Sequence, residues 1–273
     1  MTQSGPGAQF DNPCRAFGSG AQALYGRRDR ALFSGCMVSS QREVDLADVF
    51  VLLADSLSAG RDVVDTMDIL VQASTEFTAA TDAGILLADS GGVLHIVASS
   101  NERTSEVEEA QLGHDQGPCL DCFASGEPLE IPNLSEESGR WPQFVAIALS
   151  RGFDAVHAFP LRLRGHTFGS LNLFSSTREP FSDQDAALAL ALAQVATISL
   201  VQYQITHNQG TVNGQLQQAL KSRILIEQAK GVLAQRHGVP IDAAFSLLRT
   251  YARTSSSKLH DIADGVVHHG LSL

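Results

Sequence analysis

The chain has little cysteine, and its first 210 residues contain no lysine. Four cysteines among 273 residues give no disulfide framework, which favours a reducing cytoplasm as its location. The N-terminus lacks a basic segment followed by an apolar run, which argues against a secretory signal. No uninterrupted apolar run approaches the ~20 residues of a membrane span, and polar residues interrupt the longest candidate, residues 186–201. We therefore expect a soluble protein with no membrane partner.

Positive charge is concentrated at the C-terminal end. Residues 1–210 carry 12 arginines and 26 acidic residues, whereas residues 211–273 carry seven basic residues and four acidic ones. The body is therefore acidic and the end is basic, although the whole chain has a net charge of −11. This asymmetry suggests an anionic partner such as nucleic acid for the end, and an ordinary solvated helix surface is the alternative.

The length allows two modest domains, each with its own core. Residues 1–41 are rich in Gly, Ser, Gln and Arg without periodicity, so we predict a disordered or weakly ordered extension. Met37 directly precedes the first periodic segment and is an alternative start of the protein.

Apolar periodicity and turn residues predict an alternation of helices and strands from residue 44 onward. Helices are expected at 44–53, 64–71, 101–109, 141–150 and 186–204, and strands at 83–88, 93–98, 128–131, 155–163 and 166–174. Asp89–Gly92 has the composition of a hairpin turn, and Ser182–Asp185 matches an N-capping box. The order predicts an α+β fold built on an antiparallel sheet.

Three further helices are expected at 216–235, 241–253 and 258–267. Asn208–Gly214 is a weak point between the first of them and the preceding long helix. Gly238–Pro240 ends that first helix, and Thr254–Ser257 offers an N-cap for the last.

Several motifs resemble a GAF domain of the variety found in actinobacterial regulators, over about residues 45–203. They are Gly117–Pro118–Cys119, Gly126–Glu127–Pro128, Ile131–Leu134, Trp141–Pro142, Phe159–Leu161 and Gly169–Leu173. The resemblance implies a module for sensing a small molecule and for dimerisation.

The C-terminal helices resemble an ANTAR domain over residues 216–267. The matching elements, in order, are Ser222–Arg223, Ile226–Gly231, Ala244–Phe245 and Leu248–Arg249. The resemblance implies an RNA-binding module of transcription antitermination regulators. Ser256 and Ser257 stand where many members carry Asn, often followed by a basic residue, so the chain departs from the pattern there.

The two resemblances together predict an extension at 1–41, a GAF-like sensory domain at 42–205 and an ANTAR-like RNA-binding domain at 206–273. The fold expected is a GAF-like antiparallel sheet flanked by helices, followed by a long linking helix and a three-helix domain.

RNA affinity comes from neutralised phosphates, and sequence is read on unpaired bases. Arg249, Arg253 and Lys258 flank the junction of the last two helices and are the first predicted contacts. Arg223, Gln228 and Lys230 come next, although Arg223 and Lys230 have the spacing to pair with Glu227 instead. Packing positions are predicted at Ala229, Gly231, Ala244 and Phe245.

Cys119 and Cys122 form a single CxxC motif, whereas a structural zinc site needs four ligands. No metal site is predicted. Cys119 also stands where free methionine sulfoxide reductases carry a cysteine, and two partly buried thiols near a ligand pocket are the remaining interpretation. Phe153, His157 and Phe159, which alternate at a strand edge, line such a pocket with Cys119 or else pack against a helix.

The sequence predicts a cytoplasmic regulator that is not an enzyme and forms a homodimer through the linking helix. A signal received by the GAF-like domain, with an unidentified small molecule as its ligand, would control binding of structured leader RNA and so prevent a terminator from forming. The alternatives are a cysteine-dependent reductase on a GAF fold and a ligand-sensing interaction module that binds no RNA.

Overall fold

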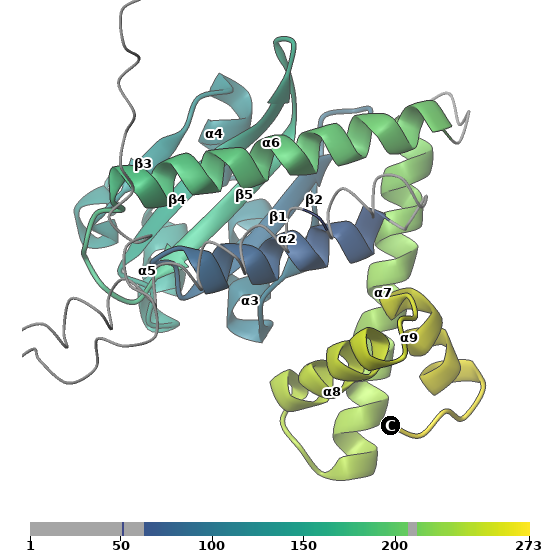
Figure 1. The fold of residues 1–273 in the computed structure, drawn as a ribbon. Helices are drawn as coiled ribbons and strands as arrows, with labels where there is room; N and C mark the ends of the chain where they lie inside the picture. The colour runs from purple at the N-terminus through teal and green to yellow at the C-terminus, as the bar shows by residue number, and fades with distance from the viewer. Residues whose placement is uncertain (1–50, 52–62, 207–211) are drawn as a thin grey trace, which may run out of the picture. The chain divides into compact units, whose positions relative to one another are not determined.

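The structure, a computed structural model, describes residue 51 and residues 63–206 and 212–273 (Figure 1). The predicted N-terminal extension, Met37 and the helix predicted at 44–53 lie outside these residues, apart from Val51, which is in helical conformation.

A five-stranded antiparallel sheet forms the centre of the part before residue 206 (Figure 1). Its strands are β1 (Asp82–Ala88), β2 (Leu94–Ser99), β3 (Leu129–Ile131), β4 (Ala155–Leu163) and β5 (His166–Ser175), in the order β2-β1-β5-β4-β3. β1–β2 and β4–β5 are hairpins. In the first turn, Asp89 Oδ1 accepts hydrogen bonds from the amides of Gly91 and Val93 at 2.8 and 2.9 Å. The predicted strands and the antiparallel α+β class are confirmed.

Helices cover both faces of this sheet (Figure 1). α2 (Val63–Phe77) and α6 (Asp183–Thr206) pack on one face, and α3 (Glu102–His114), α4 (Pro118–Ser125) and α5 (Pro142–Ser150) lie on the other. Successive strand residues point to opposite faces, so Ile85 joins the core under α2 while Leu86 packs beside Cys119 of α4.

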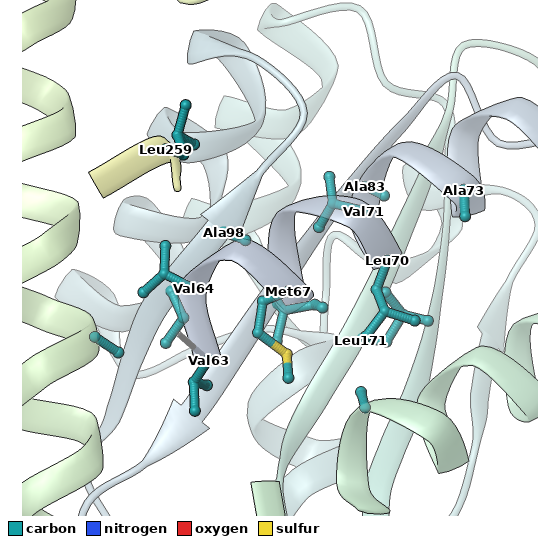
Figure 2. Packing of buried hydrophobic residues seen from close by; sticks show 14 of the residues in the cluster. Val63, Val64, Met67, Leu70, Val71, Ala73, Ala83, Ala98, Leu171 and Leu259 are labelled. Atoms are coloured by element: carbon teal, nitrogen blue, oxygen red, sulfur yellow. The ribbon is translucent and has the colours of Figure 1, made fainter. Parts of the chain in front are cut away.

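α2 is held to the sheet by a continuous apolar face (Figure 2). Val63, Val64, Met67, Leu70 and Val71 recur at helical spacing and are at most 4% exposed. They share one core cluster with Ala98 and Leu171 of the sheet and with Leu259 near the chain's end (Figure 2). Burying each large aliphatic side chain contributes roughly 1.5–3 kcal/mol.

α6 begins at the predicted capping box, where Ser182 Oγ accepts from the Asp185 amide at 3.1 Å. Its stretch Asp183–Val201 is, in the described chain, the one helix long and apolar enough by composition to cross a membrane, and 39% of it is buried. A core helix passes the same test, and α6 packs on α2 and β4. Leu192 is fully buried there, whereas Leu190 and Ile198 are exposed, so Leu192 packs within the chain.

α4 is a helix that periodicity did not predict. It is short, with Pro118 at its first position and Gly126 in the left-handed conformation as its C-cap, at φ 69°. Proline at the start and glycine after the end are helix signals, but eight residues give too few turns for a periodic pattern.

The C-terminal part folds into α7 (Val212–His237), α8 (Ile241–Thr254) and α9 (Leu259–His268), which confirms the three predicted helices. Ala229, Ala244 and Phe245 are buried between them as predicted. Gly231 is not a packing position, because it is exposed and a Cβ there would meet nothing within 4 Å.

The start of α9 differs from the prediction of a cap by Thr254–Ser257. Its N-cap residue is Lys258, and no side chain of that residue caps the helix. Instead Asp65 of α2 accepts a hydrogen bond from the Leu259 amide at 3.0 Å through Oδ1. A carboxylate from a helix far away in sequence thus satisfies one of the free amides and the positive end of the helix dipole.

A substitution at Gly169 tests how closely β1 packs against β5. A Cβ at Gly169 would lie 1.9 Å from the backbone oxygen of Leu86, and backbone of a central strand cannot move aside cheaply. Gly169→Ala should lower the free energy of unfolding, measured with denaturant, by about 3 kcal/mol or more. Gly231→Ala is the control, with an expected gain of about 0.5–1 kcal/mol in an open helical position. Equal stability of the two variants would contradict this account.

Candidate functional site

The six predicted RNA contacts fall into two groups in the structure. Gln228, Arg253 and Lys258 are exposed. Arg223 is half-buried, and the side chains of Arg249 and Lys230 are only 14% and 2% exposed. Only the first group is open to solvent in this conformation.

Arg249 of α8 is held by the GAF-like part of the chain. Its guanidinium donates to Asp68 of α2, with Nε and Nη2 at 3.0 and 2.6 Å from Oδ1. The same group donates to the backbone oxygens of Ser99 and Ser100 at 3.0 and 3.1 Å, where β2 ends. The guanidinium stacks on Phe245, with Arg249 Cζ 3.6 Å from the centre of the ring. A guanidinium paired with a carboxylate in this way is among the strongest polar contacts of proteins.

Lys230 of α7 has a similar environment. Its Nζ lies 3.0 Å from Glu102 Oε2 at the start of α3 and 2.7 Å from Glu227 Oε2 in its own helix. The pairing of Lys230 with Glu227, left open by the sequence, therefore exists. The Glu102 amide in turn donates to Asp242 Oδ1 at 3.0 Å.

The four predicted pocket residues do not come together. Phe159 joins the core under α2 and α6, and His157 stacks on Phe181 with ring centres 4.0 Å apart. Phe153 packs against Phe174 on the opposite face, below Arg103, while Cys119 lies with Leu86 under α4. Burial lowers the pKa of His157 to about 4, so its ring is neutral at neutral pH.

A different set of side chains forms a buried polar cluster between α3, α4 and the sheet. We define the interior cluster as Glu108, Gln111, Ser170 and Asn172, all fully buried. Asn172 Nδ2 donates to Glu108 Oε1 at 2.9 Å, and Gln111 Oε1 accepts from the amide and thiol of Cys119 at 3.2 and 2.7 Å. Glu108 reaches the sheet because Gly84 has no side chain, since a Cβ there would lie 2.3 Å from Glu108 Oε1.

The interior cluster has polar atoms without a partner among the described residues. They are Glu108 Oε2, Gln111 Nε2, Ser170 Oγ and Asn172 Oδ1. Buried polar atoms are normally hydrogen-bonded, so these donors and acceptors have the chemistry to bind water or a small polar molecule. Burial raises the pKa of Glu108 to about 7, while the bond from Asn172 and the charge of Arg223 in α7 oppose that rise.

The two thiols of the CxxC motif are buried and free. Burial and the charge of Glu108 raise the pKa of Cys119 well above its ordinary value, and burial raises that of Cys122 to about 12. Both therefore remain thiols at neutral pH, whereas nucleophilic and redox cysteines need the thiolate. In the described part of the chain, no group of three or more His, Cys, Asp or Glu side chains could hold a metal ion.

Sequence reasoning missed the interior cluster and the partners of Arg249. Glu108 sits in a polar helix whose sequence reads as exposed, and Asp68 interrupts an apolar stripe on α2. One signal was available: Gly84 and Gly169 stand inside strands, where glycine often marks close approach of another group.

Glu108 should make stability depend on pH. Its pKa in the folded protein is about 7, above the ordinary 4.5, so the folded state binds more protons between these values. The stabilisation is complete below about pH 4.5 and is lost as the pH rises through 7. Glu108→Gln cannot ionise, so its free energy of unfolding relative to the parent should rise by about 2 kcal/mol from pH 5.5 to 8.5.

The measurement is denaturant unfolding across that pH range, with Glu109→Gln as a control on the exposed side of the same helix. The control should follow the parent at every pH. A constant difference between Glu108→Gln and the parent would mean that Glu108 binds protons equally in the folded and unfolded states over this range, so that folding does not raise its pKa.

Comparison with known proteins agrees with this architecture. The family model of the GAF domain matches residues 60–201, and that of the ANTAR domain matches residues 214–267. No curated protein matched the chain.

Three solved structures are among those similar to this chain. The GAF domain from an Acinetobacter phosphoenolpyruvate-protein phosphotransferase is 15% identical, covering 59% of this chain and 96% of that one, with a TM-score of 0.46. The GAF domain/HD domain protein from Geobacter sulfurreducens is 19% identical. The match covers 55% of this chain and 98% of that one, with a TM-score of 0.44. The type II free methionine-R-sulfoxide reductase from Thermoplasma acidophilum is 17% identical. The match covers 50% of this chain and 91% of that one, with a TM-score of 0.42.

Such distant similarities carry no argument about activity, and the domain assignment rests on the two family matches. GAF and ANTAR domains are regulatory rather than catalytic modules. The chain belongs to the GAF domain family and, because an ANTAR domain follows its GAF domain, it is a signal-sensing regulator of the GAF–ANTAR type.

Proposed function

We propose that the protein is an antitermination regulator whose ANTAR domain, over 206–273, binds structured leader RNA under control of the GAF domain, over 42–205. The ANTAR match on the basic end of an acidic chain carries this proposal. Arg253 and Lys258 support it, because both are exposed where α8 ends and α9 begins. Two exposed cations five residues apart at this junction can each neutralise a phosphate.

The exposed Gly231 offers a second surface for RNA. A glycine within a helix costs about 1 kcal/mol relative to alanine, and the described residues give no packing reason for it. Bare backbone beside the exposed Gln228 would let a nucleic acid approach α7 closely. The reading surface proposed is therefore Arg253, Lys258 and Gln228, with Arg223, Arg249 and Lys230 as contacts that need a different conformation.

The signal is proposed to act at the interior cluster. Glu108, Gln111, Ser170 and Asn172 provide unpaired donors and acceptors within the GAF domain, and a small polar ligand would satisfy them. The buried thiols do not favour the reductase alternative, because their raised pKa values leave them protonated. The protein is proposed to work in the cytoplasm.

Salt-dependent RNA binding tests the proposal. Arg253→Glu combined with Lys258→Glu should weaken binding of a fluorescent two-hairpin RNA by about 100-fold or more, because two phosphate contacts become repulsive. The titration is followed by fluorescence anisotropy, and the parent's affinity should fall steeply as salt rises.

Arg164→Glu is the matched control, since Arg164 is exposed in the β4–β5 turn, outside the ANTAR domain. It should bind RNA like the parent. A parent protein that ignores the two-hairpin RNA at low salt would refute the RNA-binding function and favour the interaction module without RNA.

A homodimer through the linking helix is part of the proposal. Leu190 and Ile198 lie two turns apart on α6 and are 38% and 41% exposed, so they offer an apolar contact surface. Sedimentation velocity should show a dimer, and Leu190→Glu with Ile198→Glu should shift it to monomer. The exposed pair Leu149→Glu on α5 and Val93→Glu beside β2 serves as control. A monomeric parent at all concentrations, with or without RNA, would contradict the dimer.

A further inference from the structure

Three acidic side chains of the GAF domain hold the C-terminal helices. We call Asp65, Asp68 and Glu102 the acidic dock. Asp65 binds the Leu259 amide at 3.0 Å, Asp68 binds Arg249 at 2.6 Å, and Glu102 binds Lys230 at 3.0 Å. Each member of the acidic dock thus contacts a different helix of the ANTAR domain.

The acidic dock binds Arg249 and Lys230 through negatively charged oxygen acceptors, as the phosphates of a nucleic acid would. Arg249 meets two carboxylate oxygens and two backbone oxygens, and Lys230 meets two carboxylates. Guanidinium and ammonium groups recognise phosphate oxygens through the same donors. A cation that is 14% or 2% exposed in such contacts is not available to a second anion.

These ion pairs are better suited to switching than to stability. A buried ion pair contributes little net stability, because desolvation of both charges offsets their attraction. Removing one partner is nevertheless costly, because it leaves the other charge buried and unpaired. A buried cation whose acidic partner is lost is therefore driven to water or to another anion.

We propose that the acidic dock and RNA compete for Arg249 and Lys230, so that the conformation described is one in which the GAF domain withholds these two cations. The proposal rests on the RNA-binding function proposed above and adds how that function is restrained. RNA binding would then require separation of α7 and α8 from α2 and α3.

One helix connects the acidic dock to the interior cluster. α3 carries Glu102 in its first turn and Glu108 six residues later, about 9 Å along the axis. The charge of Arg223 in α7 also acts on the interior cluster, because it favours the ionised form of Glu108. A ligand that binds Glu108 would thus act on α7 through Arg223 and on Lys230 through α3.

The experiment compares full-length variants with the fluorescent two-hairpin RNA at fixed salt. Asp68→Asn leaves Arg249 without its charge partner and should tighten RNA binding by about tenfold or more, because the competent fraction rises. Glu130→Gln removes one negative charge from the exposed face of β3 and should change affinity less than about twofold. Circular dichroism verifies that each variant is folded.

A second variant tests whether Arg249 itself is released to RNA. Adding Arg249→Ala to Asp68→Asn should cancel the gain in affinity. A gain that persists would mean that other residues bind RNA, which would overturn the competition for Arg249. Unchanged or weaker RNA binding by Asp68→Asn, with a parent that binds RNA, would overturn the competition and leave the RNA function standing.

Hydrogen exchange without RNA distinguishes failure of the acidic dock as a switch from failure of the proposed RNA-binding function. In Asp68→Asn, amides of residues 99–106 and 242–254 should exchange faster than in the parent and in Glu130→Gln, because the acidic dock has opened. Equal exchange would overturn the dock as a switch. Faster exchange with no RNA binding by any variant would refute the proposed function and, with it, competition by RNA.

Discussion

The packing of α2 on the sheet is the interaction on which the remaining arrangement depends. Met67, Leu70 and Val71 bury one face of the helix completely, and this fixes its rotation about its axis. Asp65 and Asp68, three residues apart on the same helix, are then aimed at α9 and α8. One apolar face therefore builds the GAF core and also places two charges that hold the ANTAR domain.

The uneven charge of the chain acquires a structural meaning from these contacts. The acidic body does not only repel nucleic acid; three of its carboxylates bind the basic end directly. Four cations of the basic end are exposed, Lys221, Arg236, Arg253 and Lys258, and the last two lie where α8 ends and α9 begins. Electrostatics within the chain thus divides the basic residues into an occupied set and an open set.

Local patterns predicted the elements well, because strand alternation, hairpin turns and capping boxes depend on neighbouring residues. The Ser182 cap and the β4 strand were found in this way. Long-range features were not accessible: the partner of Arg249 is 181 residues away, and the cap of α9 is 194 residues away. The sequence predicts a pocket shared by His157 and Cys119, whereas strand geometry and α4 place the two side chains on different faces of the sheet.

The hydrogen bond from the Cys119 thiol to Gln111 has a consequence for the chemistry of the intact protein. The two thiols are buried and protonated, so they resist alkylation and oxidation as long as α4 stays packed against the sheet. Their modification is therefore limited by the rate at which α4 leaves the sheet. The rate at which Cys119 and Cys122 are modified would therefore report how often α4 separates from the sheet of the GAF domain.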